Sequence, residues 1–254
     1  MKAILLGSGT SGGVPRIGND WGRCDPNNSR NRRSRVSLAV VNDDKTILVD
    51  TSPDMRCQML DNDISSIDAV VWTHDHADHS HGIDDLRQLY LNRRAPLLGY
   101  GRDYTIQSLR HRFSYVFAGE GGYPATVVPH LLTDDVKLGG MRMRWVDQPH
   151  GPVLSTGLRF ETSDASIVYA TDFSAVTDAM VALYQGCDVL IVDCLREAPH
   201  PTHAHLDMAL ALAQTCGARH TILTHMDKSL DYATLAAQLP EGVEPGYDGL
   251  TINL

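Results

Sequence analysis

Cysteine is scarce in this chain, and its few residues form no recognisable pattern. The 254 residues include five cysteines, with no Cys-x-x-Cys pair among them: Cys24, Cys57, Cys187, Cys194 and Cys216. An odd number of scattered cysteines argues against a disulfide framework. We therefore expect a reduced, cytoplasmic protein.

Long apolar runs and an excess of positive charge are also lacking. No apolar stretch reaches the length of about 20 residues that a membrane-spanning helix requires, so we expect no membrane association. Residues 1–6 run directly into a glycine-rich segment and build no signal-peptide core. The formal net charge of −9 argues against a broad surface for nucleic acid or anionic lipid.

One basic stretch near the N-terminus departs from this acidic balance. Its arginines are Arg23, Arg30, Arg32, Arg33 and Arg35. Composition favours a solvated loop with ordinary surface arginines. A clamp for a substrate phosphate is the alternative, because a guanidinium group pairs well with phosphate oxygens.

The composition is that of an ordinary globular protein, with 43% hydrophobic and 21% charged residues, and no linker divides the chain. We therefore expect one domain over residues 1–254. Apolar runs predict strands at residues 3–6, 37–41, 46–49, 69–72, 141–146, 166–170, 189–192 and 221–223. Apolar periodicity predicts helices at residues 104–116, 176–184, 206–216 and 232–239. Strands interspersed with helices indicate an α/β protein whose sheet faces are covered by helices.

A dense cluster of histidine and aspartate follows the predicted strand at residues 69–72. The chain reads T-H-D-H-A-D-H-S-H-G over residues 73–82, which places four candidate ligands close together: His74, His76, Asp78 and His79. Packing and folding do not require such a density of polar groups. Imidazole nitrogens and a carboxylate are the donors that zinc, manganese or iron accept, so the cluster predicts a metalloenzyme.

Further candidate ligands stand where other predicted strands end. These are Asp50, His150, Asp172 and His225. A solitary histidine at a strand end is usually a hydrogen-bonded surface or core residue. Residues at several strand ends can converge on one edge of a sheet, however, and we expect these to meet the cluster there.

The chain resembles the metallo-β-lactamase-fold hydrolases over nearly its whole length, because the candidate residues occur in that family's order: Asp50, His74, His76, Asp78, His79, His150, Asp172 and His225. The resemblance implies an αββα sandwich of two mixed β-sheets with outer helices. It also implies two divalent metal ions, the first bound by His74, His76 and His150, the second by Asp78, His79 and His225, with Asp172 bridging them. Asp50 would hold the ligand loop, since a ligating imidazole needs its other nitrogen fixed. Zinc, manganese and iron all suit such a site.

Two metals at a separation of about 3.5–4 Å can share a water and lower its pKa toward about 7. The resulting hydroxide would attack the phosphorus of a phosphodiester in line with the leaving oxygen. Lactams and thioesters are hydrolysed by the same chemistry. The metal signature alone therefore leaves the substrate open.

Two N-terminal features resemble the phosphodiesterase branch of this family, which includes tRNase Z and the PhnP-type phosphoribosyl cyclic phosphodiesterases. Residues 6–15 form a glycine-rich segment after the first predicted strand, and its backbone amides could approach an anion; a tight turn is the alternative. Arg35, with Ser34 and Ser37, leads into the next strand. The resemblance implies that Ser11 and Arg35 bind the substrate.

The last part of the segment His200–Asp207 resembles the PhnP-type stretch in which a histidine acts on the leaving group. This resemblance implies that His203 is the general acid. Asp78 of the ligand cluster is the other residue for which we expect a catalytic role. A general acid needs hydrogen-bond reach of the leaving oxygen. A capping or solvent-facing position is the alternative for His203, and His205 is the second candidate for the acid.

In one respect the chain departs from the PhnP-type pattern. Those proteins can carry an additional zinc between an N-terminal cysteine cluster and a histidine after the last ligand. Here only Cys24 lies in the first region, and Lys228 stands where the second partner is expected. We expect no such zinc.

These features together predict a dinuclear-metal-dependent phosphodiesterase that acts on a small cyclic or nucleotide-like phosphate. A tRNase Z-like RNA 3'-processing endonuclease is one alternative, although residues 96–130 read as strand, helix and short loop rather than as a long substrate-gripping arm. A module that binds metal and nucleotide without turnover is the other, because fold does not dictate chemistry. The sequence leaves the natural substrate and the formation of a homodimer open.

Overall fold

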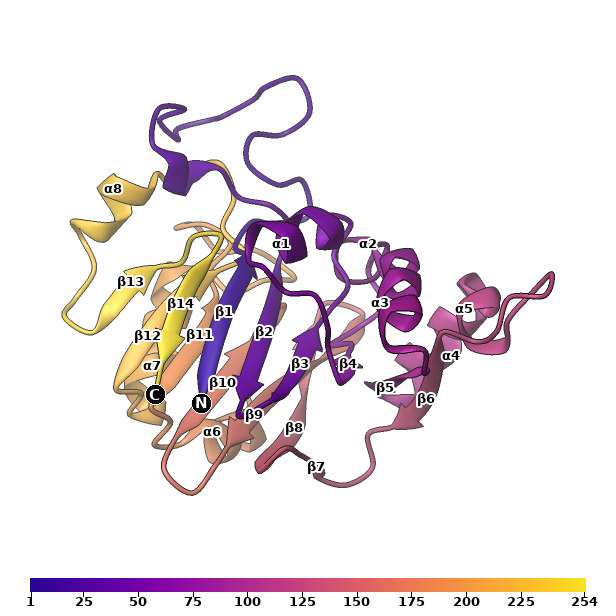
Figure 1. Ribbon diagram of the computed structural model, residues 1–254. Coiled ribbons are helices and arrows are strands. Elements are labelled where there is room, and N and C mark those ends of the chain that lie inside the picture. The colour runs from indigo at the N-terminus through magenta and orange to yellow at the C-terminus, as the bar shows by residue number, and fades with distance from the viewer.

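The computed structural model describes residues 1–254 as two seven-stranded β-sheets with helices on their outer faces (Figure 1). The first sheet has the spatial order β14-β1-β2-β3-β4-β5-β6. Its strands are β1 (Lys2–Gly7), β2 (Ser37–Asn42), β3 (Lys45–Val49), β4 (Ala69–Val71), β5 (Leu97–Gly101), β6 (Val127–Leu131) and β14 (Leu250–Asn253). Strands β3 to β6 run parallel, whereas β1 is antiparallel to both β2 and β14.

The second sheet has the order β13-β12-β11-β10-β9-β8-β7. Its strands are β7 (Val136–Leu138), β8 (Met141–His150), β9 (Val153–Glu161), β10 (Ser166–Ala170), β11 (Val189–Asp193), β12 (His220–Thr224) and β13 (Val243–Pro245). Strands β7 to β10 pair antiparallel, and β10 to β13 pair parallel. Both sheets are therefore mixed, as predicted.

Helices connect the strands and cover the sheets. They are α1 (Met55–Asp61), α2 (Ala77–Ser80), α3 (Leu86–Arg93), α4 (Asp103–Arg112), α5 (Ser114–Ala118), α6 (Asp178–Tyr184), α7 (Leu206–Cys216) and α8 (Tyr232–Ala236), with short 3₁₀ turns at Ser29–Asn31 and Ile83–Asp85. None of them combines the length and the apolar character needed to cross a bilayer. The chain ends lie together, with the Leu254 amide donating to the Met1 carbonyl at 2.9 Å (Figure 1).

Alternation along the strands explains the layers. In β1, Ala3 and Leu5 belong to the core between the two sheets, whereas Ile4 and Leu6 pack outward with residues of α1, α3 and α4. In β10 the same alternation places Tyr169 between the sheets and Val168 against α6 and α7. Because successive strand side chains point to opposite faces, each sheet is apolar on both faces and requires a cover on each.

The predicted α/β sandwich is confirmed, and all eight predicted strands are present. Several expected bounds were wrong. The helix expected over residues 176–184 begins at Asp178, and the helix expected over residues 232–239 ends at Ala236. The helix expected over residues 104–116 is broken at Phe113, whose φ of −126° and ψ of 46° are not helical, and becomes α4 and α5. The strand expected to stop at residue 146 continues to His150, which is therefore its last residue rather than a residue beyond it.

The parallel strands direct their carboxyl ends toward one edge of the sandwich. The long connection from β1 to β2 lies above this edge in Figure 1. In this connection, Gly9 bridges Arg35 on one side and Met226, the residue after His225, on the other. A side chain at Gly9 would stand 2.8 Å from the Arg33 Cβ atom, so glycine permits the close approach of the two ends of this connection.

Candidate metal centre

The first half of the site is the loop that follows β4, and a buried aspartate after β3 supports it. Asp50 Oδ2 lies 2.7 Å from His79 Nδ1. The same carboxylate accepts hydrogen bonds from the Thr73 amide and the Thr73 hydroxyl, each at 2.8 Å. Asp50 is fully buried, and burial raises the pKa of its carboxyl group against the opposing effect of His79. This contact turns the other nitrogen of His79, Nε2, toward the site.

The second half comes from separate strands of the other sheet. His150 ends β8, Asp172 follows β10, and His225 follows β12. All three are buried, with 2% exposure or less. His150 Nδ1 lies 2.7 Å from the carbonyl oxygen of Thr202, which leaves its Nε2 atom free to face the loop after β4.

Asp172 stands between these halves and divides its two oxygens between two groups of histidines. Its Oδ1 atom lies 3.2 Å from His79 Nε2 and 3.6 Å from His225 Nε2. Its Oδ2 atom lies 3.5 Å from His150 Nε2 and 3.8 Å from His74 Nε2. This is the arrangement expected of a carboxylate that faces two cation positions.

The candidate ligand atoms form compact groups. One group is His74, His76, His150 and Asp172, and another is Asp78, His79 and His225, each with its ligand atoms within 4.8 Å of one another. The buried Nε2 atoms of His74, His79 and His225 have no hydrogen-bond partner. Buried polar atoms without partners are rare and costly, so these nitrogens fit a bound cation. The donor set of nitrogen and carboxylate oxygen suits a divalent metal.

The electrostatics of the site are those of closely opposed acids and imidazoles. For His225, burial acts to lower the pKa, but Asp172 and its neighbouring carboxylates raise it to about 9. For Asp172, burial acts to raise the pKa, but His225 and His79 hold it well below its usual value. Burial lowers the pKa of His74 well below its usual value, and His79 adds to that effect. A cation would replace protons in these contacts, because metal ligands bind in their deprotonated form.

Three of the site residues occupy a strained backbone conformation. Asp50, Asp172 and His225 have φ values of 62°, 54° and 58°, and each lies within two residues of a strand end. Left-handed backbone is unfavourable for residues other than glycine and occurs disproportionately at functional sites. Here it turns each side chain at the end of a strand toward the centre.

His203 lies against this centre, and His205 does not. His203 Nδ1 is 3.7 Å from Asp172 Oδ2, and its ring stacks on His225 with centroids 4.6 Å apart. His205 is the residue before α7, and its side chain makes no capping hydrogen bond. His203 also contacts Asp193 at 3.1 Å, a buried residue that the sequence analysis missed. Its position in the sequence could have identified it. Asp193 stands at the end of an apolar strand, and Asp50 likewise directly follows one.

The two predicted substrate-binding residues lie outside the ligand groups. Ser11 is exposed in the turn after β1, and Arg35 Nε pairs with Asp54 Oδ2 at 3.0 Å. The basic stretch is also not simply solvated. Arg33 is 1% exposed and donates to the carbonyls of Asp227 at 3.1 Å and Leu230 at 2.7 Å, so it ties this stretch to the chain that follows His225.

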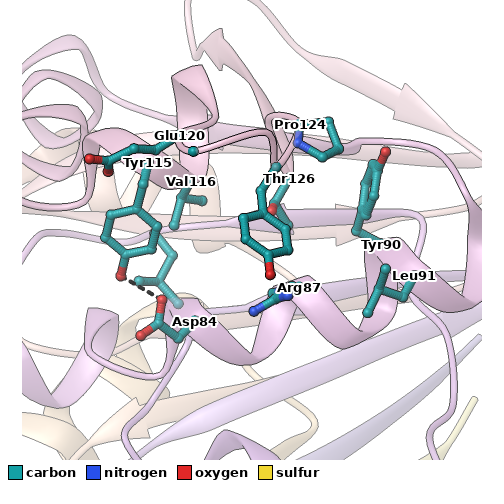
Figure 2. Close-up of a pocket in the computed structure, with 12 residues that line it drawn as sticks. Asp84, Arg87, Tyr90, Leu91, Tyr115, Val116, Glu120, Pro124 and Thr126 are labelled. Carbon is teal, nitrogen blue, oxygen red and sulfur yellow. Dashed lines mark hydrogen bonds between the residues drawn. The ribbon is translucent and has the colours of Figure 1, made fainter.

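A separate cavity of about 570 Å³ lies between α3, α5 and the turn that follows α5 (Figure 2). None of the residues that line it is a candidate ligand. Four of its residues contact one another in pairs: the Tyr115 hydroxyl donates to Asp84 at 2.5 Å, and the Arg87 guanidinium stands 4.4 Å from the centre of the Tyr123 ring. The cavity is therefore distinct from the metal centre.

Comparison with known proteins agrees with this geometry. Residues 45–226 match the family model of the beta-lactamase superfamily domain. A crystal structure of a diphosphatase from the PhnP family is 38% identical, covers 100% of this chain and 97% of its own, and superposes with a TM-score of 0.91. Zn²⁺-bound PqqB from Methylobacterium extorquens is 19% identical over 100% of both chains, with a TM-score of 0.79, and shares the fold.

A curated relative, the octanoyltransferase of Porphyromonas gingivalis, is 32% identical over 98% of this chain. This chain spans only 51% of the length of that protein. The matched family model covers well over half of the chain. The histidines and aspartates of the centre all lie within its residues 45–226. The chain therefore belongs to the β-lactamase superfamily, in its PhnP branch, and has the metallo-β-lactamase fold.

Proposed function

We propose that the protein is a phosphodiesterase that uses two divalent metal ions to hydrolyse a small cyclic or nucleotide-like phosphodiester. The observation that carries the proposal is the division of the Asp172 carboxylate between two histidine groups, with Oδ1 facing His79 and His225 and Oδ2 facing His74 and His150. A single cation would use only one of these groups.

Each side chain has a role in this proposal. His74, His76 and His150 hold one ion, Asp78, His79 and His225 hold the second, and Asp172 contacts both. Asp50 keeps His79 in the orientation that presents Nε2 to the centre, through its 2.7 Å contact with Nδ1. When bound, two divalent ions would acidify a water and neutralise charge on the phosphate oxygens. Zinc and manganese are the first candidates and iron is the third.

His203 supplies the proton to the leaving oxygen. Its ring lies beside the centre, 3.7 Å from Asp172 through Nδ1, and its side chain is 13% exposed. A general acid must be close to the reacting group and still reach the substrate, and this partial exposure satisfies both needs. Ser11 and Arg35 remain our candidates for substrate contacts, and Arg35 would have to exchange Asp54 for a phosphate oxygen.

Several features support a small substrate over RNA. The segment that would carry a long RNA-gripping arm forms β5, α4, α5 and β6 instead, all within residues 97–131. The formal net charge of −9 disfavours a polyanion. The diphosphatase relative adds diphosphate esters to the candidate substrates. The octanoyltransferase relative is about twice as long as this chain. Because of this relative, an octanoyl thioester is included as a comparison substrate.

The test is hydrolysis of bis(p-nitrophenyl) phosphate by protein loaded with zinc, manganese or iron, followed by a panel of cyclic phosphates, nucleotides and diphosphate esters. His76→Ala removes an exposed candidate ligand, and we expect its rate to fall by more than about 100-fold. His130→Ala, at an exposed histidine of β6 outside the ligand groups, is the matched control and should keep the wild-type rate. Tight metal binding without hydrolysis of any phosphodiester would favour the non-catalytic binding module.

The remaining parts of the proposal concern the setting of the protein. We place it in the cytoplasm, because all five cysteines are free thiols and four of them are buried. We also propose that residues 1–254 form one domain. Sedimentation at several concentrations would decide between a monomer and a homodimer.

A further inference from the structure

The turn that follows β10 holds Asp172 in its left-handed conformation, and side chains of the neighbouring hairpin β8–β9 grip the backbone of this turn. Asp172 has a φ of 54°, and its carbonyl oxygen accepts a hydrogen bond from the Ser155 hydroxyl at 2.6 Å. The carbonyl oxygen of Thr171 accepts one from the Gln148 side-chain amide at 2.7 Å. Because left-handed backbone is unfavourable for aspartate, these two contacts help to offset its cost.

Gln148 and Ser155 face each other across β8 and β9, and both are fully buried. Gln148 Nε2 also donates to the Ser155 hydroxyl at 2.9 Å, so its two hydrogens serve Ser155 and Thr171. A carbonyl oxygen can only accept, so the contact with Thr171 fixes which end of the Gln148 amide is the nitrogen. The amide oxygen, Oε1, therefore faces the other way, toward α6.

A tyrosine of α6 completes this chain of hydrogen bonds. The Tyr184 hydroxyl donates to Gln148 Oε1 at 2.7 Å. Tyr184 is 0% exposed, and burial raises the pKa of its hydroxyl well above the usual value, so the group keeps the proton that it donates. The hydroxyl passes over Gly157 of β9, where a Cβ atom would overlap it. Glycine weakens the interior of a strand, and here it makes room for this contact.

The donors all run in one direction, from Tyr184 through Gln148 and Ser155 to the backbone beside the metal centre. A buried network in which every member is paired is rigid. None of these three side chains is charged. The network therefore acts on the shape of the turn that carries Asp172 and not on the charge of the centre.

We propose that Ser155, Gln148 and Tyr184 are positioning residues, which hold the turn after β10 so that the two oxygens of Asp172 face the two histidine groups. The inference rests on the proposed function, in which Asp172 contacts both metal ions. Without the Ser155 hydroxyl, the Asp172 carbonyl loses its partner and the backbone can leave the left-handed conformation. The carboxylate then turns away from at least one of the two groups.

The first measurement is amide hydrogen exchange of the metal-free protein at Ser174, whose amide closes this turn by donating to the Pro149 carbonyl at 2.7 Å. The amide of Ile191 in β11 is the reference, because a global loss of stability speeds its exchange at least as much. One hydrogen bond contributes about threefold to tenfold to such an opening. We therefore expect the ratio of the Ser174 rate to the Ile191 rate to rise at least about threefold in Ser155→Ala and in Tyr184→Phe.

Thr156→Val is the matched control for this measurement. Thr156 is the next residue of β9, it is as buried as Ser155, and its hydroxyl has no hydrogen-bond partner. We expect this variant to keep the wild-type ratio. A wild-type ratio in Ser155→Ala would overturn the proposal whether or not the protein binds metal, so this test is independent of the proposed function. A wild-type ratio in Tyr184→Phe would overturn the part assigned to α6.

The second measurement is the affinity of the folded variants for Zn²⁺ and for Mn²⁺, determined by competition with a chromophoric chelator. Residues that support metal ligands contribute about 10–100-fold to affinity, so we expect Ser155→Ala to bind at least about tenfold more weakly and Thr156→Val to bind as the wild type does. Tyr184→Phe is the milder change, with an expected loss of about threefold, and it serves if Ser155→Ala does not fold.

The two measurements together distinguish the possible failures. Faster exchange at Ser174 with wild-type metal affinity in Ser155→Ala would show that the network serves only the fold, and would overturn the inference alone. If the wild-type protein bound neither Zn²⁺ nor Mn²⁺, the proposed function would fail, and with it the role of the network toward a metal.

Discussion

The two halves of the candidate metal centre are built in different ways. The first half takes His74, His76, Asp78 and His79 from six consecutive residues after β4. The second half takes one side chain each from the ends of β8, β10 and β12, which lie far apart in the sequence. A short loop can carry several ligands because a single strand end positions all of them. The second half depends on the order of strands in the sheet.

The two halves also differ in their supporting carboxylates. Asp50 uses both oxygens, on Thr73 and His79, and so holds the loop and one candidate ligand together. Asp193 uses only Oδ2, while its buried Oδ1 has no hydrogen-bond partner and stands 3.8 Å from His225 Nδ1. Asp50 therefore contacts a single histidine, whereas Asp193 lies between His203 and His225. The comparison predicts that losing Asp50 affects metal binding.

The largest effect is expected where the two halves meet. Asp172→Ala removes the carboxylate that faces both histidine groups, so both halves should fail together. Since loss of a mere supporting residue costs about 10–100-fold, we expect the phosphodiesterase rate to fall by more than about 100-fold and the metal content per chain to fall as well. Elemental analysis and hydrolysis of bis(p-nitrophenyl) phosphate measure these. If Asp172→Ala kept two metals per chain and the wild-type rate, each half would bind its metal independently, which would contradict the shared role of Asp172.

A smaller effect is expected from the support of the first half. Asp50→Asn places an amide against His79 Nδ1 and weakens the orientation of one candidate ligand. We expect metal affinity to fall by about 10–100-fold, measured by competition with a chromophoric chelator. Asp54→Asn is the matched control, because Asp54 lies in the same loop and pairs with Arg35 rather than with a histidine. An unchanged metal affinity in Asp50→Asn would show that the loop after β4 keeps His79 oriented without the Asp50 carboxylate.

The smallest effect is expected at the rim of the ligand loop. Ser108 of α4 donates to Asp75 Oδ2 at 2.5 Å, and Asp75 lies between His74 and His76. The Asp75 side chain is 29% exposed, so water replaces the lost partner in Ser108→Ala. We expect the free energy of unfolding to fall by less than about 1 kcal/mol, with metal content at the wild-type level. Urea denaturation measures the first quantity. A large loss of metal would mean that α4, and not only Asp50, holds the first half.

The same contrast decides what could be predicted from the sequence. Strands such as β1, β10 and β11 are continuous apolar runs, and they were found. Strand β5 was expected only without bounds, within residues 96–130, because Gly99 interrupts it, and β6 was missed because Pro129 interrupts it. Gly99 is required by its neighbour, since a side chain there would stand 2.9 Å from the Trp72 ring, and Pro129 is tolerated because β6 is an edge strand. In β9, a side chain at Gly157 would overlap the Tyr184 hydroxyl, so glycine again reflects a distant contact.

What the sequence determined by itself was the chemistry of the ligand loop, because residues close in the chain stay close after folding, and four donors after one strand form a site with little help. It also determined the layered fold, since the strand pattern needs cover on both faces. Only the tertiary structure decided that Asp172 faces both halves, that His203 rather than His205 lies at the centre, and that Asp193 stands behind it. Those relations join residues from different strands, and the distances between them depend on how the two sheets pack.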